Sequence, residues 1–196
     1  MPIRVILQGI SQASLLVDND EKYVHCGRGV LVYVAFLKPD KDTGGITDED
    51  VARAVHTLLE TNIFTHFNPE KMVARAQSLA ECPKVDIMIV PQASLGGKIN
   101  KKGHSVQFHH LVSKDIGEAL YERFCHHFRV ARGINEEVVD ANGVSLNAAE
   151  EGLCTTESNK PEKWVKYDGR VVSGTFGNRQ GLFIESDGPF THTFDL

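Results

Sequence analysis

The chain has 196 residues and a mass of 21.7 kDa, with 41% hydrophobic and 24% charged residues. This size and composition are typical of one globular domain that buries about 70% of its unfolded surface, and they exclude extensive disorder. The formal net charge of −5 excludes nucleic-acid binding through an overall positive field, so any contact with RNA needs a local basic patch.

The N-terminal part of the chain predicts two strands. Residues Ile3 to Gln8 and Arg28 to Leu37 are rich in β-branched and apolar side chains, and the second run is apolar enough for the centre of a sheet. Its apolar core, "GVLVYVAFL", falls short of the roughly 20 residues needed to cross a bilayer, so we expect no membrane span. The segment "VDNDEKYVHCG" between the two runs is predicted to be a polar connection.

Two helices are predicted in the next part of the chain. Thr47 followed by Asp50 resembles a capping box, and apolar residues at helical spacing behind it predict a helix over about 48–61. The segment "NPEKMVARAQSLAEC" predicts a second helix, with Asn68 as its cap and Pro69 at the first helical position.

A buried strand and a long helix follow. The strand covers Val85 to Val90, runs into Pro91 and stops at Gly96 and Gly97, which leaves its carboxyl end exposed. The helix spans about Asp115 to Arg132 and ends at Gly133. Its predicted apolar face consists of Ile116, Ala119, Leu120, Phe124, Phe128 and Ala131.

The C-terminal part begins with a predicted insertion and ends in two strands. Residues 135–161 are small, acidic and polar, which is typical of an inserted loop. The runs Gly181 to Glu185 and Phe190 to Leu196 favour strands, and Gly188 and Pro189 interrupt them. This break fits either a hairpin turn or a special backbone position. Without internal repeats, the pattern predicts one α+β domain over residues 1–196, with two main helices, at about 48–61 and 115–132, and about six to eight strands.

Histidine and cysteine spacing gives no indication of a metal or a cofactor. The nine histidines include two adjacent pairs, without a nearby set of carboxylate or thiolate ligands. The four cysteines are widely spaced and form no C-x-x-C motif: Cys26, Cys82, Cys125 and Cys154. We therefore expect reduced thiols, a cytoplasmic location, and no resident metal or cofactor.

Lysines gather directly after the strand that ends in "PQAS". Lys98, Lys101 and Lys102 lie in the glycine-punctuated segment "GGKINKKGHSVQFHH". They are either solvated loop lysines or residues that neutralise RNA phosphates, and in the second case they carry the salt dependence of binding.

Two motifs resemble those of the D-aminoacyl-tRNA deacylases. The segments "VPQASLGG" and "IESDGPFTH" are similar to the family's paired elements S-Q-x-T and N-x-G-P-[VF]-T, and "IRVILQGISQASLLV", "GRGVLVYVAFLK" and "ALYERF" extend the resemblance over most of the chain. The resemblance implies the deacylase fold, a barrel-like and mostly antiparallel sheet with two main helices. It also implies hydrolysis of the ester bond of mischarged aminoacyl-tRNA.

The resemblance further implies a homodimer in which the Gly-Pro element of one subunit enters the active site of the other. Its carry-over places substrate contacts at Pro91, Ser186, Gly188, Pro189 and Phe190, with backbone carbonyls of Gly188 and Pro189 facing the aminoacyl group. It places catalysis at Gln92, Ala93 and Ser94, whose main-chain N–H groups would face the ester carbonyl as it gains negative charge. It also places catalysis at Thr191, which matches the second motif and carries, like Ser94, a hydroxyl that could assist. Neither hydroxyl is established as a nucleophile by the sequence, and the terminal ribose hydroxyl of the tRNA is an alternative participant.

Departures from the common motifs, together with "PQA" and "GPFTH", resemble the animal-type branch of the family, which has relaxed chirality. Pro91 and Ser186 replace a common serine and asparagine, and Gly9 stands where the main branch carries arginine. This branch implies a trans Gly188–Pro189 bond and removal of L-alanine as well as D-residues. The competing hypotheses are an RNA-binding domain without hydrolysis and a cysteine or histidine metal protein.

Overall fold

The computed structural model describes residues 2–39, 44–68, 72–100, 103–146, 169–188 and 190–196. The α-helices are α1 (Asp48–Glu60) and α2 (Lys114–Ala131), and the short 3₁₀ helices are η1 (Ala93–Gly96) and η2 (Glu136–Val138). The strands are β1 (Ile3–Ile10), β2 (Gln12–Leu16), β3 (Tyr23–Cys26), β4 (Gly29–Phe36), β5 (Phe64–Asn68), β6 (Val73–Gln77), β7 (Asp86–Pro91), β8 (Lys98–Ile99), β9 (Val106–Gln107), β10 (Val171–Ser173), β11 (Leu182–Glu185) and β12 (Thr191–Asp195). These elements confirm the predicted α+β class with two main helices, although the strands outnumber the prediction.

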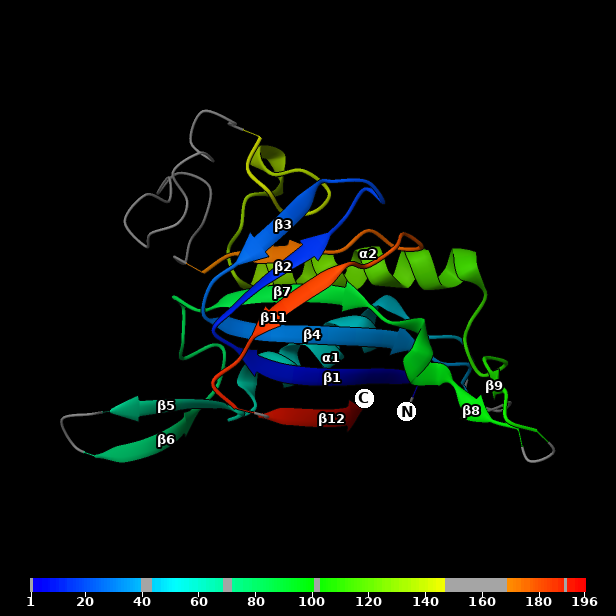
Figure 1. Cartoon of the computed structure of the whole chain (residues 1–196), viewed down its shortest axis with the longest axis horizontal. Helices are drawn as coiled ribbons and strands as arrows, with labels where there is room; N and C mark the ends of the chain where they lie inside the picture. The colour runs from blue at the N-terminus through cyan, green and yellow to red at the C-terminus, as the bar shows by residue number, and fades with distance from the viewer. Residues whose placement is uncertain (1, 40–43, 69–71, 101–102, 147–168, 189) are drawn as a thin grey trace.

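A five-stranded sheet in the order β10-β7-β4-β1-β12 forms the centre of the molecule (Figure 1). β4 pairs antiparallel with β1, and β1 pairs antiparallel with β12. β7 runs parallel to both β4 and β10. A second sheet, in the order β11-β2-β3, packs across part of one face.

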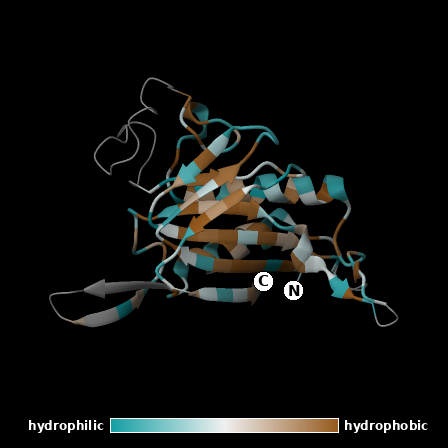
Figure 2. Cartoon of the chain, viewed as in Figure 1, coloured by the Kyte–Doolittle hydropathy of each residue, from teal (hydrophilic) through white to brown (hydrophobic). Residues whose placement is uncertain are grey.

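β4 and β7 are largely apolar along their length (Figure 2), and side chains on both of their faces are buried. On one side, residues of β1 and β4 pack against α1 and α2, with Phe124 and Phe128 fully buried. On the other side, Leu31 and Met88 pack against Leu15 and its neighbours in the second sheet. Neither helix in the described part of the chain has the length and apolarity that a membrane span requires.

The two main helices form where the periodicity predicts them. Thr47 accepts a hydrogen bond from the Asp50 backbone N–H, and the Asp50 carboxylate accepts one from the Thr47 N–H, so the capping box is confirmed. α2 ends before Gly133, whose φ of 68° favours glycine. Its buried face differs in part from the prediction, because Ile116, Ala119 and Ala131 are exposed.

Two sequence predictions upstream of β7 are wrong. The segment predicted as a helix after Asn68 instead contains β6, which pairs antiparallel with β5 in a hairpin. Aromatic and β-branched residues of β5, such as Phe64 and Thr65, favour a strand, and this pairing overrides the weak helical spacing. The predicted polar connection contains β3, in which Val24 and Cys26 are buried on one side.

The two C-terminal strands do not form a hairpin with each other. β11 pairs with β2 in the second sheet, whereas β12 pairs with β1 in the central sheet. The segment around Gly188 therefore carries the chain from one sheet to the other. A simple hairpin turn is excluded as the reason for the break.

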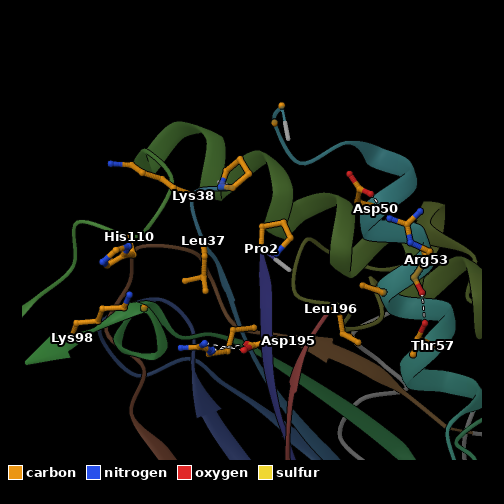
Figure 3. A pocket seen from close by; sticks show the side chains of 16 residues that line it. Pro2, Leu37, Lys38, Asp50, Arg53, Thr57, Lys98, His110, Asp195 and Leu196 are labelled. Atoms are coloured by element: carbon orange, nitrogen blue, oxygen red, sulfur yellow. Dashed lines mark hydrogen bonds and ion pairs between the residues drawn. The ribbon is translucent and has the colours of Figure 1, made fainter. Parts of the chain in front are cut away.

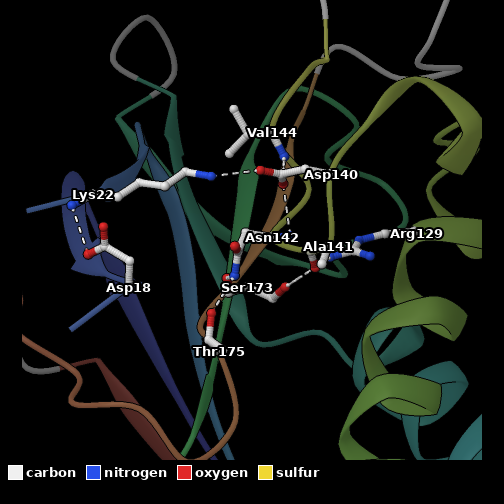
Figure 4. Close-up of polar contacts among 9 residues, drawn as sticks. All are labelled: Asp18, Lys22, Arg129, Asp140, Ala141, Asn142, Val144, Ser173 and Thr175. Carbon is white, nitrogen blue, oxygen red and sulfur yellow. Dashed lines mark hydrogen bonds and ion pairs between the residues drawn. The ribbon is translucent and has the colours of Figure 1, made fainter. Parts of the chain in front are cut away.

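Hydrogen bonds connect the first part of the predicted insertion to β10 (Figure 4). The Asn142 side chain donates to the Ser173 backbone oxygen at 2.9 Å, and the Ser173 N–H donates to the Asn142 oxygen at 2.9 Å. Asp140 accepts from the Asn142 N–H at 2.8 Å. Residues 135–146 thus pack beside β10, while residues 147–161 of the predicted insertion lie outside the described part of the chain.

Arg132 supports the segment that leads into β7, and its removal tests this support. Its buried guanidinium donates to the carbonyl oxygens of Leu79, Cys82, Pro83 and Val85 at 2.7–3.3 Å. Arg132→Ala leaves these acceptors without that donor, so we expect a loss of about 3 kcal/mol or more in unfolding free energy, measured by urea denaturation.

The matched control is Arg123→Ala, since Arg123 lies exposed on α2, the helix that Arg132 directly follows. We expect its effect to stay within about 0.5 kcal/mol. Equal losses for the two variants would contradict a role for the Arg132 contacts.

Candidate active site

The first motif lies where the central strand β7 leaves the sheet. Pro91 is the last residue of β7 and pairs in register with Val34 of β4. The Gln92 N–H donates to the Val34 carbonyl oxygen at 2.8 Å. The chain then turns into η1, so Gln92, Ala93 and Ser94 follow directly from a buried and rigid strand.

The start of η1 presents two backbone donors. Ala93 and Ser94 are exposed, and their N–H groups have no hydrogen-bond acceptor among the described residues. The helix begins with these groups unpaired because a helical N–H needs a carbonyl earlier in the same helix. Two unpaired N–H groups next to each other can bind an oxygen that carries negative charge.

The hydroxyl of Ser94 has no described partner that could act as a base. Its backbone oxygen accepts from the Gly97 N–H at 3.0 Å, but no histidine or carboxylate of the described residues bonds its side chain. Thr191 likewise lies exposed, with no described side-chain hydrogen bond. Around these two hydroxyls, the described residues therefore offer main-chain donors and no assembled nucleophile-base pair.

The second motif is held against β1. The Gly9 N–H donates to the Phe190 carbonyl oxygen at 2.9 Å. The Ser186 hydroxyl lies 2.9 Å from the Gly9 carbonyl oxygen and 2.6 Å from the Gly188 carbonyl oxygen, and it can donate to either. These contacts hold Ser186 and Gly188 beside β1, while Pro189 lies outside the described residues.

The two motifs lie at opposite ends of the central sheet. Pro91 pairs with Val34, Val34 with Val5, and Val5 with Phe194, which is three residues after Thr191. Three strand spacings of about 4.8 Å and three residues of about 3.3 Å each put the Cα atoms of Pro91 and Thr191 about 17 Å apart. Within one chain, Pro91 to Ser94 of the first motif are thus not brought together with Ser186 to Thr191 of the second.

Exposed apolar side chains surround the second motif. Phe183, Ile184 and Phe190 have exposed fractions of 66%, 40% and 56%. β11 is an edge strand of its sheet, and both Phe183 and Ile184 on it are exposed. An apolar edge strand of this kind is normally covered by another element or chain.

The predicted basic residues are only partly described. Lys98 lies exposed on β8, which forms a short hairpin with β9, while Lys101 and Lys102 lie outside the described residues. The structure adds Lys38 and His110 to this region, because the Lys38 N–H donates to the His110 carbonyl oxygen at 2.6 Å. The sequence analysis missed both residues, since they are 72 positions apart in the chain.

The cysteines and histidines give no support to a metal site. No group of three possible metal ligands occurs among the described residues. Burial raises the pKa of the Cys26 thiol to about 12 and that of Cys125 to about 11. Both thiols are therefore protonated at neutral pH, which makes them poor nucleophiles and poor ligands.

Comparisons with known proteins agree with the motifs. The D-Tyr-tRNA(Tyr) deacylase family matches residues 6–195. A Leishmania major protein with the provisional name D-tyrosyl-tRNA(Tyr) deacylase 2 is 60% identical over 97% of this chain and 100% of its own length. The D-aminoacyl-tRNA deacylase 2 of Danio rerio is 30% identical, with both chains covered completely. A solved structure described as a probable eukaryotic D-amino acid tRNA deacylase aligns with a TM-score of 0.86 and 59% identity over 100% of both chains.

The raised thiol pKa values predict slow labelling of two cysteines. In a Cys82→Ser, Cys154→Ser variant, only Cys26 and Cys125 remain, and we expect a disulfide reagent to leave both unmodified at pH 7 in the native protein. The labelling rate should rise toward pH 11, and unfolding by denaturant should expose both thiols to the reagent at the same time. Rapid labelling of the native protein at pH 7 would contradict this reading.

Proposed function

The chain belongs to the D-Tyr-tRNA(Tyr) deacylase family and hydrolyses mischarged D-aminoacyl-tRNA in translational proofreading, and we propose that two copies of the chain together form its active site. The observation that carries this proposal is the separation of the two motifs in one chain, about 17 Å by strand spacing. An aminoacyl ester is too small to bridge that distance. A second copy can bring its Gly188 segment to the first copy's Ala93 and Ser94.

The exposed edge near the second motif supports a homodimer. Phe183, Ile184 and Phe190 offer apolar area beside the segment that would enter the partner. A two-fold axis would use the same surface of both copies and would form two equal sites. The proposed dimer would thus bring the two motifs together and would also cover the exposed edge of β11.

In the proposed reaction, the N–H groups of Ala93 and Ser94 bind the ester carbonyl oxygen. Water attacks the carbonyl carbon, and negative charge moves to this oxygen in the tetrahedral intermediate. The C–O bond to the terminal ribose then breaks, the ribose oxygen takes a proton, and the free amino acid leaves. Donors of this kind contribute about 3 to 4 kcal/mol to the transition state. The ester is already activated, so positioning and these donors suffice without a triad.

The Gly-Pro element would bound the aminoacyl group from the partner's side. The Ser186 hydroxyl and the Gly9 backbone hold the segment that carries Gly188 and Phe190. Glycine allows close approach of the backbone to a ligand, and proline adds no competing N–H. Pro91 and Gln92 would bound the group from the first copy.

Substrate range and setting complete the proposal. The departures at Pro91, Ser186 and Gly9 support the animal-type branch, in which a trans Gly188–Pro189 bond leaves room for a small L-residue such as alanine. We place the enzyme in the cytoplasm. We describe it as a single domain over residues 1–196. We also propose that Lys98, Lys101 and Lys102 bind phosphates of the tRNA. A binding domain without hydrolysis is not favoured, because the relatives carry the names of deacylases.

The direct test of function is release of amino acid from purified substrates. We expect D-aminoacyl-tRNA, glycyl-tRNA and L-alanyl-tRNA to be hydrolysed by the purified protein, and L-tyrosyl-tRNA to persist. Absence of any release from D-aminoacyl-tRNA would contradict the function. Retention of L-alanyl-tRNA alone would contradict only the branch.

Backbone catalysis predicts that the two hydroxyls can be removed. We expect Ser94→Ala and Thr191→Ala each to keep the rate within about tenfold of the parent, because the N–H donors remain. Ala93→Pro is the matched positive control, since it removes one N–H at the first position of η1, where proline fits and no described acceptor is lost. We expect it to lower the rate by about 10² to 10³.

A loss of several orders of magnitude in the serine or threonine variant, with folding intact, would instead identify a side-chain nucleophile. Circular dichroism and urea unfolding of each variant provide the folding control.

The proposed dimer predicts a second outcome that can be measured without substrate. Phe183→Asp introduces a charge on the exposed edge strand and should shift the protein from dimer to monomer in sedimentation velocity. Ile116→Asp is the control, because Ile116 is 55% exposed but lies on α2. A wild-type protein that stays monomeric and fully active on dilution would refute the shared site.

A further inference from the structure

A cleft of about 680 Å³ lies at the end of the central sheet, between η1 and the first half of α1. Figure 3 shows side chains from widely separated parts of the chain around it, from Pro2 near the N-terminus to Leu196. Its charged and titratable lining residues are Arg4, Lys38, Asp50, Arg53, Lys98, His110 and Asp195. A volume of this size is sufficient for a nucleotide.

The wall of the cleft next to η1 is tightly packed. A Cβ atom at Gly96 would come within 2.5 Å of the Leu111 side chain and 3.1 Å of Leu37, so any other residue would require the Leu111 side chain to shift. Leu37 and Leu111 also form a β-bridge, and the Lys38 N–H donates to the His110 carbonyl oxygen at 2.6 Å. The backbone that carries Lys38 and His110 is therefore fixed against η1.

Both aspartates of the cleft are already paired. Arg4 donates two hydrogen bonds to the Asp195 carboxylate, at 2.7 and 2.9 Å, and this contact lowers the pKa of Asp195. Asp50 accepts from Thr47 in the capping box and pairs with Arg53. Each carboxylate is neutralised by its own arginine.

The charged side chains that remain, on the side of the cleft next to η1, are positive. Lys38 and Lys98 have no carboxylate partner among the described residues, and the His110 ring has none either. Lys38 lies shortly after β4 and Lys98 begins β8, so two different segments of the chain contribute the two ammonium groups on this side of the cleft. This arrangement leaves two ammonium groups without an ion-pair partner among the described residues on the η1 side of the cleft, where they can bind an anion.

The cleft adjoins the proposed catalytic amides. The Arg4 guanidinium donates to the Leu95 carbonyl oxygen of η1 at 3.2 Å. Ala93 is the first residue of η1, and Gly96, which lines the cleft, is the last. Because a 3₁₀ helix rises about 2 Å per residue, these two residues lie about 6 Å apart along the helix axis. A strand of RNA whose terminal ester reaches Ala93 and Ser94 can therefore pass its backbone through the cleft.

We propose that this cleft binds the sugar-phosphate backbone of the acceptor end of the tRNA, next to the nucleotide whose ester is hydrolysed. This inference rests on the proposed function and adds Lys38 and His110 to the tRNA-binding residues. Lys38 and Lys98 neutralise phosphates, and His110 donates a hydrogen bond to the same backbone. The contacts read no base, so they bind different tRNAs alike.

The test is binding of uncharged tRNA to a Lys38→Ala, Lys98→Ala double variant, measured by filter binding at several salt concentrations. We expect affinity to fall by about fivefold or more at low salt and the salt slope to decrease by about 1 to 2. The Lys38→Arg, Lys98→Arg variant should keep most of the affinity. Lys84→Ala is the control, because Lys84 is exposed and lies outside the cleft.

Inorganic phosphate distinguishes a free anion from the RNA backbone. We expect phosphate to compete with tRNA no better than chloride at equal ionic strength. Strong competition by phosphate would reassign the cleft to a free anion and overturn the proposal.

Unchanged tRNA affinity and salt slope in the double alanine variant would overturn the proposal as well. The wild-type deacylation assay is independent of these measurements. A wild-type protein that hydrolyses its substrate while the double variant binds tRNA normally would refute the cleft and leave the function standing.

Discussion

Backbone pairing along the central sheet fixes how far apart the two motifs lie in one chain. Pro91 at the end of β7 and Thr191 at the start of β12 occupy opposite ends of strands that run in the same direction. No rotation of a side chain and no small movement of a loop closes a gap of about 17 Å while the ladder is intact. The proposed site therefore requires a second chain, and the exposed apolar edge of β11 is the surface that we propose for it.

The same sheet explains why the catalytic groups that we propose belong to the backbone. β7 is buried on both faces and ends at Pro91, so the chain leaves the sheet in a defined direction and begins η1 with unpaired N–H groups. The thiols of Cys26 and Cys125 are protonated by burial, and no described base touches Ser94. Donors fixed by a rigid strand need no reorganisation during the reaction, which is the source of their effect.

Local patterns in the sequence predicted the elements whose own residues determine them. The capping box of Thr47 and the apolar spacing behind it predicted α1, and the apolar run after Arg28 predicted β4. Elements that depend on distant pairing were missed: β3 and β6 form because of their partner strands. For the proposed site, the two motifs predicted Gln92 to Ser94 as catalytic residues and Ser186 to Phe190 as part of the substrate-binding segment. Lys38 and His110 were not predictable, because only the fold brings them together with Lys98.

Subunit complementation tests the central claim most directly. One variant, Ala93→Pro, loses a proposed oxyanion donor, and a second, Gly188→Val, obstructs the Gly-Pro segment. Each should be nearly inactive alone. If the site is shared, dissociating and reassociating an equal mixture should restore about a quarter of the wild-type activity, because half of the dimers are mixed and each mixed dimer contains one intact site and one doubly damaged site. Mixed dimers that form, as shown by mass spectrometry, but remain inactive would contradict a site built from two chains.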